Sequence, residues 1–178
     1  NIPFTVGGGI SSVDHAARLL DSGADKISVN TAAVANPELI DAIASKYGSQ
    51  FVFVAIDARC VDGVWRITTH GGSRFTDKEL FAWAREAQER GAGEILFTSM
   101  DHDGTKRGYP CDTFARMASE LSIPIIASGG AGSVADIAEV LSLGRADAAL
   151  AASIFHYGEI SVAELKRQLA EQGINVRI

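Results

Sequence analysis

Apolar runs typical of β-strands alternate with helix-forming stretches from one end of the 178-residue chain to the other. Between the strand-like runs, apolar residues recur three and four positions apart and so share one helix face, as in Val13, Ala16, Ala17 and Leu20. The strand-like runs are apolar nearly throughout, which is typical of parallel strands with helices on both faces of the sheet. We therefore predict an α/β fold of about six βα units. The expected strands are residues 4–6, 26–29, 51–56, 94–99, 123–128 and 147–151.

Helix start and stop signals fall between these strands. Asn36 followed by Pro37 predicts the first turn of one helix. A second helix is expected from a cap at Thr76 to a stop at Gly91, and a last one over residues 161–173.

One segment departs from the alternation. Residues 58–75 contain short β-type runs around Asp62-Gly63, a pair that favours a tight turn between antiparallel strands. This predicts a β-hairpin inserted after the third strand. Because no linker or low-complexity stretch interrupts the chain, residues 1–178 are expected to form a single domain.

Composition excludes several classes of partner. A net charge of −6 gives no electrostatic reason to bind nucleic acid or an anionic membrane. No apolar run reaches the roughly 18 residues of a membrane-spanning helix. Cys60 and Cys111 lack a C-x-x-C spacing, so we expect free thiols in a reducing cytoplasm. The four dispersed histidines show no zinc spacing, and neither a metal nor a cofactor is expected.

Two passages of the chain resemble each other. They are "GGGISSVDHAARLLDSGAD", which begins at Gly7, and "SGGAGSVADIAEVLSLGRAD", which begins at Ser128. The same interval separates Gly9 from Gly130 and Leu20 from Leu141, and it is too long for a solenoid repeat. The pattern indicates a duplicated half-domain.

The duplicated glycines precede helix N-termini, where backbone N–H groups and the positive helix end favour an anion. Each glycine cluster is followed one strand later by a small polar pair, Asn30-Thr31 in the first half and Ala152-Ser153 in the second. Tight βα turns alone would also explain one cluster. Two clusters in equivalent positions favour two phosphate sites, around Gly9 and Gly130, that face each other across a barrel mouth and hold one doubly phosphorylated ligand.

Other polar residues follow strands at the same edge. Asp57 ends the apolar run "FVFVAI", where a carboxylate could act as a general acid or base or could only cap the next loop. The segment "DHDGTKRG" lacks the glycine and glutamate positions of a calcium-binding loop. We interpret it as a glycine-hinged active-site loop that brings Gly104 near one phosphate. Lys26 and Glu94 begin their strands at the opposite end, where a structural salt bridge is the default interpretation.

Six passages, in this order, resemble the family of cyclase subunits of imidazole glycerol phosphate synthase: "IPFTVGGGI", "GADKISVNTAAV", "VAIDAR", "GAGEILFTSMDHDGTKRGY", "PIIASGGAG" and "ADAALAASIFH". The resemblance implies a (β/α)₈ TIM barrel built from two similar halves. It also implies a lyase of histidine biosynthesis that takes ammonia from a glutaminase partner. The substrate would be the phosphoribulosyl-formimino form of aminoimidazole-carboxamide ribonucleotide. The products would be imidazole glycerol phosphate and aminoimidazole-carboxamide ribonucleotide.

The resemblance assigns roles to individual residues. Asp57 matches a catalytic carboxylate, and Lys26 and Glu94 match part of a charged gate through which ammonia enters the barrel. The remaining matches form the two phosphate sites, Gly9, Asn30 and Thr31 in one and Gly104, Gly130 and Ser153 in the other.

The chain begins at what would be the third strand of that barrel, so it corresponds to strands three to eight. Roughly 75 of about 250 residues, with a second catalytic Asp, have no counterpart. We therefore expect the chain alone to be inactive and to self-associate through open strand edges. Two alternatives stay open: the sister phosphoribosyl-formimino isomerase of the same pathway, and a truncated, non-catalytic barrel that binds phosphates.

Overall fold

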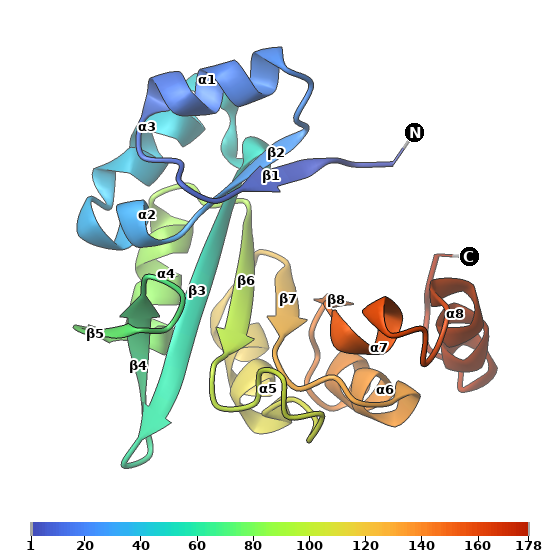
Figure 1. Cartoon of the computed structure of the whole chain (residues 1–178). Coiled ribbons are helices and arrows are strands. Elements are labelled where there is room, and N and C mark those ends of the chain that lie inside the picture. The colour runs from blue at the N-terminus through green and yellow to red at the C-terminus, as the bar shows by residue number, and fades with distance from the viewer. Residues whose placement is uncertain (1, 178) are drawn as a thin grey trace. The chain divides into compact units, whose positions relative to one another are not determined.

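The computed structural model describes residues 2–177 and divides the chain into two compact units, Asn1–Phe97 and Thr98–Ile178. Figure 1 gives the order of the elements along the chain. The expectation of a single domain stays a prediction.

The first unit is a sheet with strand order β1-β2-β3-β6. β1 (Thr5–Gly7) pairs in parallel with β2 (Lys26–Val29), and β2 pairs in parallel with β3 (Val52–Val61). β6 (Glu94–Ser99) begins in this unit. Its helices are α1 (Val13–Asp21), α2 (Thr31–Ala35), α3 (Glu38–Tyr47), the short 3₁₀ helix η1 (Ser49–Phe51) and α4 (Leu80–Glu89). Fully buried Ile27, Ile40 and Val54 belong to its core.

β3 continues past the residues that pair with β2, and its second half pairs with an antiparallel strand. It pairs with β4 (Val64–Thr69) around the turn at Asp62-Gly63, and β4 pairs with β5 (Arg74–Glu79). The expected helix cap at Thr76 is wrong, because Thr76 lies in β5 and its hydroxyl donates to the carbonyl of Ile67 at 3.1 Å. α4 begins four residues later, with Glu79 as its N-cap.

The second unit continues the alternation of strands and helices. It contains α5 (Cys111–Glu120), β7 (Ile125–Ser128), α6 (Val134–Ser142), β8 (Ala148–Ala149), α7 (Ser153–His156) and α8 (Val162–Glu171). β7 and β8 are parallel, with Ile126 opposite Ala148. Helices α5 and α6 contact β7 and β8, and their buried side chains include Phe114, Met117 and Val140.

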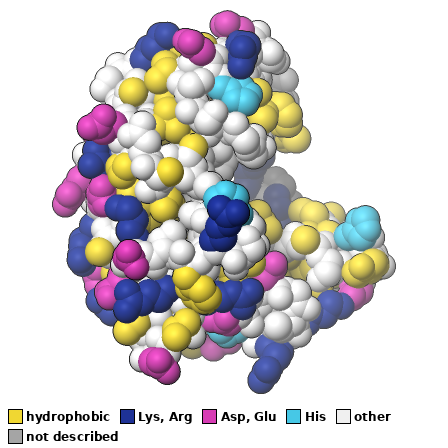
Figure 2. Space-filling model, turned by 60° about the vertical axis from the view of Figure 1, so that its left-hand side comes forward, with side chains coloured by type: hydrophobic (Ala, Val, Ile, Leu, Met, Phe, Trp, Pro, Cys, Tyr) yellow, Lys and Arg dark blue, Asp and Glu magenta, His cyan; other side chains and the backbone are white. Residues whose placement is uncertain are grey.

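The predicted α/β fold with parallel strands is confirmed, and the repeated βα unit is that of the (β/α)₈ barrel type. The expected strands at 26–29 and 94–99 have the predicted bounds, whereas β3 is longer and β8 shorter than expected. None of the described helices is both long enough and apolar enough to cross a bilayer. On the face drawn in Figure 2, basic and acidic side chains are interspersed, and neither sign of charge dominates.

Candidate functional site

A cavity of about 540 Å³ lies at the carboxyl ends of β1 and β2, and all its lining residues belong to the first unit. Gly8 and Gly9 have φ angles of 98° and 69°, which only glycine adopts without strain. This left-handed turn leads into α1, where the Ser12 side chain caps the helix by accepting the His15 N–H at 3.1 Å. The cavity therefore has a glycine turn and a helix N-terminus at one wall. Its lining includes Gly7, Gly8, Gly9, Ser28, Asn30 and Thr31.

The polar pair that follows β2 supplies groups of opposite hydrogen-bonding character. The Oδ1 atom of Asn30 is buried and has no hydrogen-bond partner among the described residues. Thr31 Oγ1 already accepts the backbone N–H of His70 at 3.2 Å, which leaves the hydroxyl proton of Thr31 as a donor. A ligand in this cavity could therefore accept from Thr31 and donate to Asn30.

Asp57 lies within β3 and not at its end, because pairing with β4 extends the strand to Val61. It lies just past the end of β2, since the last residue of β2, Val29, is opposite Val54 and Asp57 comes three residues later. The Nδ2 atom of Asn30 donates to Asp57 Oδ2 at 3.0 Å. The structure thus joins the candidate general acid or base by a direct hydrogen bond to Asn30, which lines the first cavity.

A second, smaller cavity of about 100 Å³ lies at the ends of β7 and β8, entirely within the second unit. Gly129 and Gly130, with φ angles of 86° and 122°, lead towards α6, whose cap Ser133 accepts the Asp136 N–H at 3.2 Å. The local geometry repeats that of Gly8–Gly9 and Ser12 in the first unit, as the duplicated sequence predicts. The lining includes Asp103, Gly104, Ser128, Gly130, Ala152 and Ser153.

The loop that carries Gly104 folds against the end of its own strand. The carbonyl of buried Ser99 accepts the N–H groups of His102 and Asp103 at 3.2 and 2.9 Å, and the Ser99 hydroxyl contacts His102 Nδ1 at 2.7 Å. These contacts orient Gly104 (φ 73°) towards the second cavity. The structure therefore brings Gly104, Gly130 and Ser153 together, and separately Gly9, Asn30 and Thr31.

Lys26 and Glu94 form an ion pair, as the default interpretation of the sequence predicts. They are the first residues of β2 and β6, and 28% and 22% of their side-chain surfaces are exposed. They lie at the end of the strands opposite the first cavity.

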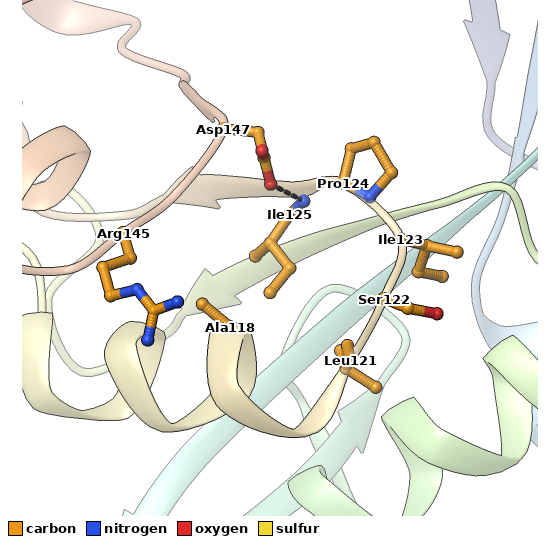
Figure 3. A pocket seen from close by; sticks show the side chains of 8 residues that line it. All are labelled: Ala118, Leu121, Ser122, Ile123, Pro124, Ile125, Arg145 and Asp147. Atoms are coloured by element: carbon orange, nitrogen blue, oxygen red, sulfur yellow. Dashed lines mark hydrogen bonds between the residues drawn. The ribbon is translucent and has the colours of Figure 1, made fainter.

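A third cavity, of about 250 Å³, lies at the amino-terminal end of β7, away from the glycine turn at its other end (Figure 3). Its lining includes Leu121, Pro124, Ile125, Arg145 and Asp147, and Asp147 accepts the Ile125 N–H at 2.8 Å. The Asp147 carboxylate thereby caps the start of the strand. No residue predicted for the site from the sequence lines this cavity.

Two contacts near the sites were not foreseen from the sequence. The His70 turn between β4 and β5 contacts Thr31, and the Tyr109 hydroxyl donates to the Leu150 carbonyl at 2.9 Å. Burial is the main reason that the Tyr109 pKa is raised, so this phenol stays protonated. His70 reaches its site because β4 pairs with β3. Tyr109 reaches its site through the fold of the β6–α5 connection.

No group of three or more His, Cys, Asp or Glu side chains that could hold a metal ion occurs among residues 2–177. The two cavities instead offer backbone N–H groups and hydroxyls, which suit phosphate oxygens.

Comparisons with known proteins identify relatives along the whole chain. Residues 1–161 match the family described as "Histidine biosynthesis protein". A protein of Bacteroides fragilis (strain YCH46) is 56% identical over 177 residues, which cover 99% of this chain and 71% of the relative. A protein of Flavobacterium psychrophilum is 54% identical over 178 residues, or 100% of this chain and 71% of the relative. Both are named "Imidazole glycerol phosphate synthase subunit HisF". The chain therefore belongs to the histidine biosynthesis protein family, among the HisF subunits of imidazole glycerol phosphate synthase.

Proposed function

We propose that the enzyme that carries this sequence has the cyclase activity of imidazole glycerol phosphate synthase. In this lyase reaction, ammonia and the phosphoribulosyl-formimino form of aminoimidazole-carboxamide ribonucleotide give imidazole glycerol phosphate and aminoimidazole-carboxamide ribonucleotide. The observation that carries the proposal is the Asn30–Asp57 hydrogen bond, because it links a carboxylate to an anion site of the expected type.

Each end of the doubly phosphorylated substrate would occupy one cavity. At the first, phosphate oxygens would accept from the backbone of the Gly8–Gly9 turn and from the Thr31 hydroxyl. At the second, they would accept from the Gly130 turn and the Ser153 hydroxyl, with Gly104 as the opposite wall. These neutral groups suit the task because each can donate a hydrogen bond to a phosphate oxygen while carrying no charge of its own.

Asp57 would transfer protons during ring closure. A half-buried carboxylate oriented by an amide donor is suited to take a proton from attacking ammonia and to return it to a leaving group.

The Lys26–Glu94 ion pair would act as the gate for ammonia from a glutaminase subunit. Its position at the amino-terminal ends of β2 and β6 is away from the first cavity, and a nitrogen donor could enter there. A cytoplasmic location suits such a biosynthetic enzyme and is part of the same proposal.

Self-association through strand edges also stays part of the proposal. β1 is the terminal strand in the order of the first unit, and the nearby side chains of Ile2 and Phe4 are 80% and 58% exposed. Light scattering of the 178-residue chain should give the mass of a dimer or a larger assembly. A monomer at all concentrations would contradict this part alone.

The names of the relatives favour the cyclase over the sister isomerase. A chain that binds phosphate without catalysis is the second candidate, and the phosphate sites by themselves do not distinguish it from an enzyme. Turnover in the presence of ammonia, measured on the enzyme that carries this sequence, distinguishes the two candidates.

Inorganic phosphate tests the sites directly. Crystals soaked in phosphate should contain one anion against Gly9, Asn30 and Thr31 and another against Gly130 and Ser153. Ordered loops with neither position occupied would contradict the two-site proposal.

A further inference from the structure

Tyr109 is a buried residue whose polar atom faces the second cavity's wall and not solvent. Its exposed fraction is 7%, and its ring packs edge-on against Phe114 with a centroid separation of 6.3 Å. The hydroxyl donates to the carbonyl of Leu150 at 2.9 Å. A buried phenol that served only to fill space could be replaced by phenylalanine, so the hydrogen bond needs its own explanation.

Leu150 begins the segment that forms one wall of the second cavity. β8 ends at Ala149, and the lining residues Leu150, Ala151 and Ala152 follow without regular structure. The next lining residue, Ser153, is the first residue of α7. The Leu150 side chain is 44% exposed and anchors this segment poorly. Two backbone contacts hold Leu150 instead: its N–H donates to Ala127 at 2.7 Å, and its carbonyl accepts from Tyr109.

The residue before Tyr109 holds the opposite wall. The Gly108 N–H donates to the Gly130 carbonyl at 2.9 Å. A methyl group on Gly130 would come within 2.1 Å of the Gly108 carbonyl oxygen, so the two segments are in close contact. Adjacent residues of the β6–α5 connection thus bind both walls of the same cavity.

We propose that Tyr109 is a positioning residue for the second phosphate site. Its hydroxyl fixes the Leu150 peptide and thereby the direction of the Ala151–Ser153 backbone and of the Ser153 hydroxyl relative to the Gly130 turn. The inference rests on the proposed phosphate site and adds the residue that sets its shape. Without the hydroxyl, the segment after β8 would keep one backbone anchor and the site would lose its preformed geometry.

The test compares Tyr109→Phe with Tyr157→Phe, each of which removes one phenolic oxygen. Tyr157 is 73% exposed, and its ring contacts His156, so it is a matched control in the same unit. Inorganic phosphate is titrated while the backbone amide NMR signals of Gly130 and Ser153 report the second site. Those of Gly9 and Thr31 report the first site in the same sample.

Tyr109→Phe should raise the phosphate concentration at half-saturation of Gly130 and Ser153 about 5-fold, the effect of one lost hydrogen bond. The response of Gly9 and Thr31 should stay unchanged, and Tyr157→Phe should leave both sites unchanged. An unchanged second site in Tyr109→Phe would overturn the inference alone. An equal loss at both sites would also overturn it, since that result indicates a general loosening of the fold. If Gly130 and Ser153 do not respond in the natural protein, the second phosphate site fails and the inference fails with it.

Discussion

The side-chain amide of Asn30 donates to the carboxylate of Asp57 at 3.0 Å, across the boundary between β2 and β3. The parallel register brings the two together, since Val29 and Val54 are opposite each other and both polar residues follow them. Asn30 also lines the first cavity. One residue therefore contacts both the candidate phosphate site and the candidate acid or base.

Asn30→Ala should lower kcat by about 10-fold or more in the enzyme that carries this sequence, because Asp57 loses the donor that orients it. Asn36→Ala, on an exposed residue after α2, is the control and should leave kcat unchanged. Steady-state kinetics with ammonia measure both. A raised KM with an unaltered kcat would mean that Asn30 serves only the phosphate.

The two glycine turns should differ in their tolerance of a side chain. Gly9→Ala places its methyl group in open space and should cost roughly 1–2 kcal/mol for the left-handed backbone. Gly130→Ala adds a collision with the Gly108 carbonyl and should cost on the order of 3 kcal/mol or more. Urea unfolding measures both free energies, and equal losses would show that the Gly108–Gly130 contact is looser than described.

Glu94→Gln should lower glutamine-dependent turnover several-fold while turnover with external ammonia changes little, if the Lys26–Glu94 pair gates ammonia. Glu86→Gln is a matched control, because the Lys78–Glu86 pair is similarly half-buried, with each side chain 33% exposed. The ratio of the two activities is the relevant quantity. If the ratio of glutamine-dependent to ammonia-dependent turnover is the same in Glu94→Gln and in the natural protein, the Lys26–Glu94 pair has only a structural role.

Cys111 should react slowly with alkylating agents. Burial, and then the nearby carboxylates of Glu139, Asp112 and Asp136, raise its thiol pKa to about 11. A raised pKa keeps the thiol protonated below that value, so at pH 8 only about one molecule in a thousand carries the thiolate. Mass spectrometry after iodoacetamide treatment should show exposed Cys60 modified first. Both should react in urea, and rapid labelling of Cys111 in the folded protein would contradict the raised pKa of its thiol.

The sequence predicted most of the strands and the two glycine turns because local signals determine them. Apolar runs identified β2 and β6, and the glycines before Ser12 and Ser133 identified both helix-end turns. The length of β3 was not predictable in this way, since it depends on pairing between Asp57 and Thr68 across the hairpin. The roles of Tyr109 and His70 likewise depend on contacts with residues far away in the sequence.

The central claim is that Asp57 transfers protons beside the first phosphate site, and substitution of its carboxylate tests it most directly. Asp57→Asn keeps the size of the side chain but removes its basicity. In the enzyme that carries this sequence, ammonia-dependent formation of imidazole glycerol phosphate should fall by about 10²-fold or more. Asp77→Asn, on an exposed residue of β5, should leave the rate unchanged. Turnover of Asp57→Asn close to that of the natural protein would contradict the account.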